Sequence, residues 1–124
     1  MENTVIFEKN AISKLCDELK IYNKIYIITS PTPRSMFLGI ISNLLNERNK
    51  TFWVHTLPKN AICSKDNILI STSKVKSANI IVALGAGTVC DVAKIVGEKV
   101  DVPVIVVPTT VSHFGFFNNI SYIS

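Results

Sequence analysis

The sequence predicts an α/β domain built on a doubly wound, mostly parallel, Rossmann-like sheet. Short runs rich in Val, Ile and aromatic residues alternate along the chain with longer segments of helical periodicity. The short runs are continuously apolar, which is typical of parallel strands that helices cover on both faces. The chain has 124 residues, of which 48% are hydrophobic and 18% are charged, so we expect one domain over residues 1–124.

The predicted strands are runs of four or five residues bounded by Ser, Pro, Gly or Lys: residues 24–28, 52–55, 80–84 and 104–107. Residues 120–124 are predicted to begin a further strand. Because ligands bind beyond the carboxyl ends of such strands, the residues that follow each run are the candidates for function.

Helices are predicted between the strands from apolar residues that recur every three or four positions. The first stripe consists of Ile12, Leu15, Cys16 and Leu19. The second consists of Phe37, Ile40, Ile41, Leu44 and Leu45. A weaker segment contains Ile68, Leu69 and Val75, and a clear one contains Val89, Val92, Ala93 and Val96. We interpret these stripes as the core.

Composition narrows the class of protein. Thirteen Lys and Arg against nine Asp and Glu give a formal charge of +4, but the basic residues are scattered, which argues against a nucleic-acid surface and fits attraction for phosphorylated small molecules. Three cysteines without C-x-x-C spacing argue against a zinc site or a disulfide framework. No apolar run reaches the ~20 residues of a membrane span and no signal peptide is evident, so we expect a cytoplasmic protein.

The segment from Gly85 to Lys94 is the first candidate site. It follows the apolar run 80–84 with Gly-Ala-Gly and then a helical pattern, an arrangement that brings backbone amides close to a phosphate. It is neither the G-x-G-x-x-G fingerprint, since Cys90 takes the last glycine position, nor a P-loop. The alternatives are a nucleotide phosphate cradle and a strand-to-helix turn that binds nothing.

The segment from Pro108 to Asn119 is the second candidate. Hydroxyls and amides gather directly after a predicted strand, as in a ligand loop. His113 is a general acid or base, or a structural hydrogen-bonding residue. Phe114, Phe116 and Phe117 pack against other protein, or one of them shapes a pocket.

The segment from Thr29 to Arg34 is the third. A carboxylate after a strand would accept the ribose hydroxyls of NAD and repel a 2′-phosphate, but the residue here is Ser30, and Arg34 lies close by. NADP is therefore allowed. Pro33 and Arg34 equally well begin a helix.

Together these segments resemble the N-terminal domain of the superfamily of dehydroquinate synthase, glycerol dehydrogenase and iron-containing alcohol dehydrogenases. The superfamily motif Gly-Gly-Gly-x-x-x-Asp-x-Ala-Lys is matched by Gly85-Ala86-Gly87 with Asp91, Ala93 and Lys94, and the Pro-Thr loop by residues 108–110. The sn-glycerol-1-phosphate dehydrogenase subfamily is the most similar, through residues 30–33 and 109–115.

The resemblance implies a dinucleotide site, NAD or NADP. It places around the pyrophosphate and the nicotinamide the residues Gly87, Thr88, Val89, Cys90 and Asp91. It places along the dinucleotide the residues Thr109, Thr110, Val111, Ser112 and Asn118. Ala86 replaces the middle glycine, which is tolerable if its φ is negative. Phe114 replaces an acidic substrate contact, so we expect a less polar alcohol or a shifted substrate site.

The resemblance further implies a helical domain, beyond residue 124, whose Asp and His residues bind a divalent metal, zinc or iron. No metal ligand is predicted within this chain, which we expect to be an N-terminal piece and inactive alone. The implied function is a metal-assisted oxidoreductase, homo-oligomeric in its complete form, that acts on a small polyol or polyol phosphate in phospholipid biosynthesis. The alternatives are a dehydroquinate-synthase-like lyase and a non-catalytic nucleotide-binding module.

Overall fold

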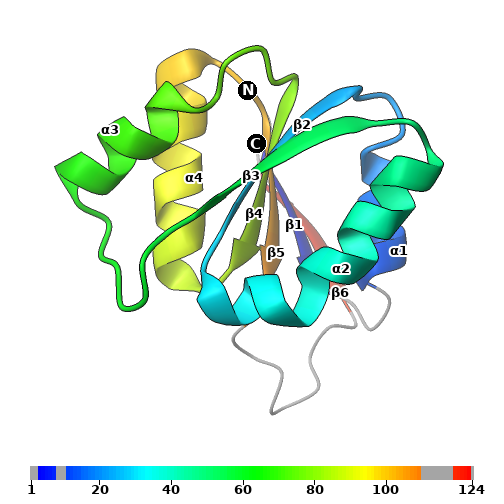
Figure 1. Cartoon of the computed structure of the whole chain (residues 1–124), viewed down its shortest axis with the longest axis horizontal. Helices are drawn as coiled ribbons and strands as arrows, with labels where there is room; N and C mark the ends of the chain where they lie inside the picture. Colours follow the sequence, from blue (N-terminus) through cyan, green and yellow to red (C-terminus); the bar gives the residue numbers. More distant parts are fainter. Residues whose placement is uncertain (1–2, 8–10, 110–118, 124) are drawn as a thin grey trace.

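The computed structural model of the chain describes the backbone of residues 3–7, 11–109 and 119–123 and the side chains of residues 14–109. Strands and helices alternate along it (Figure 1). The strands are β1 (Asn3–Phe7), β2 (Lys24–Thr29), β3 (Thr51–Thr56), β4 (Ile80–Gly85), β5 (Val104–Pro108) and β6 (Asn119–Ile123). The helices are α1 (Ala11–Glu18), α2 (Pro31–Glu47), α3 (Lys65–Ser73) and α4 (Gly87–Val100).

The strands form one six-stranded sheet in the order β3-β2-β4-β5-β1-β6. Every neighbouring pair is parallel except β1 and β6, which are antiparallel. The predicted α/β class with a mostly parallel sheet is therefore confirmed. The strand β1 is not among the strands predicted from the sequence.

Helices cover both faces of the sheet, α1 and α2 on one face and α3 and α4 on the other (Figure 1). Successive side chains of each central strand point to opposite faces of the sheet and pack against the two helix layers alternately. In β2, Ile25 and Ile27 pack in the α1 and α2 layer, whereas Tyr26 and Ile28 pack in the α3 and α4 layer. This two-sided burial is the reason that β2, β4 and β5 are apolar without alternation.

Two predicted core positions are wrong. Ile40 in α2 is 53% exposed, because the buried residues of that helix, Pro33, Ile41 and Leu45, recur every four or eight positions and Ile40 is turned about 100° away from Ile41. Leu69 in α3 is 56% exposed. Only Ser71 is buried within that helix, which explains its weak periodicity.

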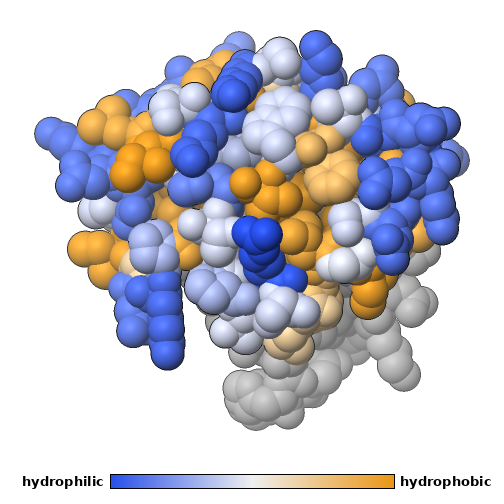
Figure 2. Space-filling view, viewed as in Figure 1, coloured by the Kyte–Doolittle hydropathy of each residue, from blue (hydrophilic) through white to orange (hydrophobic). Residues whose placement is uncertain are grey.

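The strand β3 forms one edge of the sheet, and all but its first residue are half-buried. Figure 2 shows hydrophobic side chains near the middle of this face, over β3, and others over α3, where Leu69 and Ile70 are exposed. Within the described part of the chain, no helix combines the length and the apolarity that crossing a membrane requires.

The order of the strands creates a switch point between β2 and β4. From β2 the chain runs through α2 to β3 on one side, and from β4 it runs through α4 to β5 on the other. The helices α2 and α4 lie on opposite faces of the sheet, and both begin at the end of the sheet where the strands β2 and β4 finish (Figure 1). In open α/β sheets such a divergence opens a crevice beyond the strand ends, which is where ligands bind.

Candidate functional site

Two glycines in the turn between β4 and α4 have different roles. Gly85 has a φ of +159°, and a Cβ atom there would lie 2.9 Å from Cγ2 of Val89, so a side chain would collide with the first turn of α4. A Cβ atom at Gly87 would meet nothing within 4 Å. Gly85 therefore permits close packing of strand and helix, and Gly87 leaves open space where α4 begins.

The first turn of α4 presents backbone amides toward that space. Ala86 is the N-cap residue with a φ of −92°, the negative value that the sequence reading required of it, and its side chain caps no amide. The N–H of Cys90 donates to the carbonyl of Ala86 at 3.0 Å. The preceding amides, of Gly87, Thr88 and Val89, have no acceptor within the helix. Together with the helix dipole they suit an anion.

The side chains of the predicted cofactor residues on α4 lie in different surroundings. Val89 and Cys90 are buried in the core between α4 and the sheet, so these two residues offer a ligand only backbone atoms. Thr88 is half-buried and Asp91 is exposed. Burial raises the pKa of the Cys90 thiol to about 11, which outweighs the opposite effect of Lys94 and keeps the thiol neutral.

The end of β5 lies beside this turn. Gly85 pairs with Pro108, and the N–H of Thr109 donates to the carbonyl of Gly85 at 3.1 Å. The half-buried Thr109 thus adjoins the glycine turn. The remaining predicted residues of this loop lie outside the described residues: Thr110, Val111, Ser112, His113, Phe114 and Asn118.

The end of β2 borders the turn on its other side. Thr29 is fully buried, and its hydroxyl donates to the carbonyl of Leu84 at 2.7 Å, which ties β2 to β4 at the switch point. Arg34 lies in the first turn of α2, where its N–H donates to the carbonyl of Ser30 and its Nη1 donates to Oγ1 of Thr56 at 2.7 Å. The helix α2 begins at Pro31, two residues before the predicted start, so Pro33 and Arg34 lie in its first turn.

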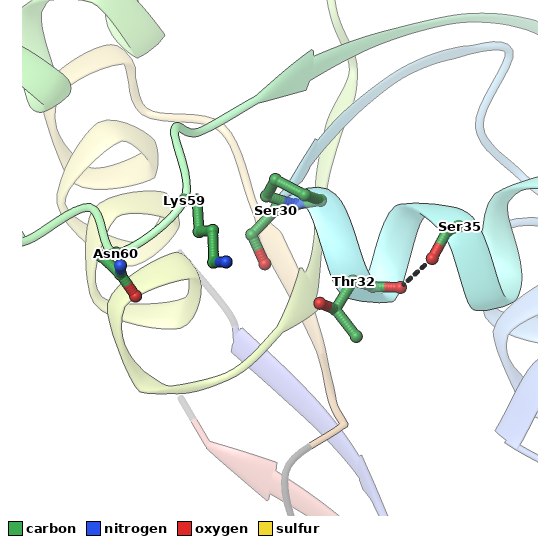
Figure 3. Close-up of a pocket in the computed structure, with 6 residues that line it drawn as sticks. Ser30, Thr32, Ser35, Lys59 and Asn60 are labelled. Carbon is green, nitrogen blue, oxygen red and sulfur yellow. Dashed lines mark hydrogen bonds between the residues drawn. The ribbon is translucent and has the colours of Figure 1, made fainter.

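A polar pocket of about 490 Å³ opens at this end of the sheet (Figure 3). It is lined by Ser30, Pro31, Thr32, Ser35, Lys59 and Asn60. Lys59 and Asn60 belong to a tight turn after β3, which is not among the candidate segments predicted from the sequence. The signal available was the Pro-Lys-Asn segment of residues 58–60, which begins three positions after the end of the predicted strand 52–55.

Among the residues described, no three His, Cys, Asp or Glu side chains come together in a group that could bind a metal ion. The described residues around the β4–α4 turn and the pocket offer backbone amides, hydroxyls and the Lys59 ammonium group, beside the exposed Asp91 carboxylate. Such donors suit phosphate and sugar oxygens.

Comparison with known proteins agrees with the fold and the motifs. Residues 6–123 match the family model of the iron-containing alcohol dehydrogenases. Curated relatives include the glycerol-1-phosphate dehydrogenases [NAD(P)+] of Metallosphaera sedula, 30% identical over 84% of this chain, and of Thermococcus sibiricus, 32% identical over 86% of it. The chain spans about 30% of the length of each of these two relatives.

Solved structures show the same fold at lower identity. An iron-containing alcohol dehydrogenase superimposes with a TM-score of 0.70 at 21% identity, over 86% of this chain and 36% of that one. The glycerol dehydrogenase of Schizosaccharomyces pombe gives a TM-score of 0.62 at 17% identity, over 84% of this chain and 27% of that one. The family match over nearly the whole sequence settles the classification: this chain belongs to the iron-containing alcohol dehydrogenase family.

Proposed function

We propose that this chain is the dinucleotide-binding part of an NAD(P)-dependent oxidoreductase that acts on a polyol or polyol phosphate. The substrate class follows the activity of the curated relatives, which are glycerol-1-phosphate dehydrogenases. The observation that carries the cofactor assignment is the open space at Gly87, where backbone amides without helical acceptors meet the switch point of the sheet.

In this proposal the amides of Gly87, Thr88 and Val89 hold the pyrophosphate. Gly85 allows α4 to pack so closely on β4 that these amides lie at the end of the strand. When bound, the nicotinamide exchanges a hydride with the alcohol carbon of the substrate. The residues of this chain bind the dinucleotide and orient it, with Thr109 on the β5 side of the pyrophosphate and Ser30 on the β2 side.

The family description names iron, but the described residues do not fit a metal site. We place the ligands of a divalent metal outside these residues and derive no step through it. The effect of Phe114 on substrate polarity, at a position outside the described residues, stays a prediction.

The proposal is tested by Gly87→Val in the full-length protein. The branched side chain fills the space proposed for a phosphate and removes at least two hydrogen bonds to charged oxygens, so dinucleotide affinity falls by about 100-fold, or roughly 3 kcal/mol. Calorimetric titration with NADH and NADPH measures this loss.

Gly39→Val is the matched control. Gly39 lies in α2, and a Cβ atom there also meets nothing within 4 Å, so the same change away from the site should leave the affinity unaltered. Equal affinities in the wild type and both variants would refute the assignment of the β4–α4 turn to the cofactor.

A further inference from the structure

The turn between α1 and β2 carries an apolar side chain where polar residues are usual. The N–H of Tyr22 donates to the carbonyl of Leu19 at 3.0 Å and closes a four-residue turn. Lys20 and Ile21 occupy its two central positions, where Gly, Asn, Asp and Ser are the common residues. Ile21 is 81% exposed, more than any other large hydrophobic side chain in the described part of the chain. At that exposure it contributes little to the core.

The fold holds the chain in place on both sides of Ile21. Leu19 is buried in the core between α1 and the sheet, and the half-buried Tyr22 packs against the same core. The carbonyl of Asn23 then accepts a hydrogen bond from the N–H of Thr51 at 2.9 Å. The turn is therefore preorganised, so presenting Ile21 to a partner costs little conformational entropy.

Basic side chains gather around this turn, at the end of the sheet where the strands begin (Figure 1). Lys20 and Lys24 flank Ile21 along the chain, and both are exposed. The ammonium of Lys50, just before β3, donates to the carbonyl of Lys20 at 2.8 Å. This bond brings the turn between α2 and β3, which also carries the exposed Arg48, against the turn between α1 and β2.

The carboxylates near this end of the sheet belong to the helices and not to the two turns. Asp17 and Glu18 lie in the last turn of α1, and Glu47 ends α2. Residues 19–24 and 48–51 contain four basic residues and no acidic one. The two turns therefore place a positive rim beside an exposed apolar side chain, and the net charge of +4 on the whole chain adds to their attraction for anions.

An apolar side chain among cations matches the surface of an anionic lipid bilayer. Anionic head groups attract Lys and Arg side chains that lie near the surface. The layer beneath the head groups accepts an apolar side chain, while neighbouring lysines keep their ammonium groups at the polar level. A nucleic acid would attract the same cations, but it offers Ile21 no apolar layer. The combination therefore favours lipid over nucleic acid.

We infer that the turns at residues 19–24 and 48–51 are a docking site for an anionic lipid surface. Ile21 enters the head-group layer, and the four basic residues contact the anionic head groups. The β4–α4 turn lies at the opposite end of the sheet, so the proposed dinucleotide site faces away from the lipid (Figure 1). This inference does not depend on the proposed function.

The test is cosedimentation of the full-length protein with vesicles of phosphatidylcholine alone and of phosphatidylcholine mixed equally with phosphatidylglycerol. The protein should bind the mixed vesicles at low salt and the neutral vesicles at least about tenfold more weakly. High salt should remove most of the binding, because it screens the attraction between exposed charges. Equal binding to both kinds of vesicle, or no binding to the mixed ones, overturns the inference.

Ile21→Ser tests the apolar contact. It should weaken binding to the mixed vesicles about tenfold, because a serine gains little on leaving water. Ile62→Ser is the matched control, since Ile62 is 70% exposed in the loop that follows the carboxyl end of β3, and its affinity should equal that of the wild type. Both isoleucines are exposed, so both variants should fold, as thermal unfolding would verify.

Lys24→Gln tests the charge and should weaken binding about fivefold. Lys65→Gln is its control, because it removes the same charge from an exposed position at the start of α3, on the opposite face of the sheet from α1 and α2, and should change binding less than about twofold. A loss in Lys24→Gln with unchanged binding in Ile21→Ser would identify a general polyanion surface and overturn the lipid assignment. A protein that binds vesicles as expected but no dinucleotide would overturn the proposed function and leave this inference standing.

Discussion

The helices α3 and α4 pack on the same face of the sheet but begin differently. Both N-cap residues are extended, with φ and ψ of −98° and 162° at Ser64 and of −92° and −169° at Ala86. Ser64 accepts a hydrogen bond from the N–H of Asn67 at 3.1 Å, whereas Ala86 has no side chain able to do so. With the same backbone geometry at the N-cap, α3 is capped by its own serine, whereas the first amides of α4 are left without a side-chain acceptor. The open start is the one at the switch point.

The largest effect on this contrast is expected at Gly85. In Gly85→Ala the new methyl group would press on Val89 in a backbone conformation unfavourable for a side chain, so the free energy of unfolding should fall by about 3 kcal/mol. Urea unfolding monitored by circular dichroism measures the loss. Gly87→Ala, in open space, should change stability by less than about 0.5 kcal/mol, and similar losses in the two variants would contradict the different roles assigned to these glycines.

The capped helix should be more sensitive to its cap than to other surface serines. Ser64→Ala leaves the Asn67 amide without its acceptor and should lower stability by about 1 kcal/mol in urea unfolding. Ser35→Ala is the control, since the Ser35 hydroxyl bonds only a carbonyl of the helix in which it lies. An equal loss in both variants would mean that the cap contributes nothing specific.

The open helix can be closed by mutation. Ala86→Ser places a capping hydroxyl on a backbone already in the capping conformation, which should stabilise the protein by about 1 kcal/mol. The hydroxyl competes with phosphate for the same amides, so dinucleotide affinity should fall about fivefold. Unfolding and calorimetric titration of the one variant measure both effects, and a gain of stability with unchanged affinity would separate these amides from the cofactor.

The smallest expected effect concerns the thiol at the start of α4. A helix N-terminus ordinarily lowers a thiol pKa, but burial of Cys90 raises it to about 11. At pH 8 iodoacetamide should modify the exposed Cys63 and leave Cys90 intact, as mass spectrometry of the digested protein would show. Reaction at Cys90 below pH 9 would mean that the open N-terminus of α4 lowers the pKa of the thiol by more than burial raises it.

The elements that could be predicted best from the sequence are the central strands, which are apolar because helices cover them on both faces. The strands β2, β4 and β5 are buried on both faces, so continuous Val and Ile runs identified them. The strand β1 starts with the polar residues Asn3 and Thr4, so its apolar run is too short to be recognised as a strand from the sequence. In α3 the exposed Leu69 and Ile70 blurred the helical stripe.

At the candidate site, local chemistry was predictable and spatial arrangement was not. The glycine turn follows from the sequence of one segment, and so does the condition that Ala86 needs a negative φ, which the structure meets. The pairing of Thr29 with Leu84, and hence the position of Lys59 beside the turn, depends on strand order. Strand order reflects which face each helix packs on, and no single segment encodes it.

The place of β1 between β5 and β6 has a consequence for biosynthesis. Asn3 pairs with Val104 and with Ile123, so β1 waits for strands that are synthesised about 100 residues later. At ribosomal speeds of about 5–20 residues per second, that delay lasts on the order of 5–20 seconds. The strands β2, β3 and β4 can pair sooner, because fewer residues separate them along the chain. During the interval both edges of β1 are unpaired in the nascent chain. This segment is therefore a natural place for a chaperone to act.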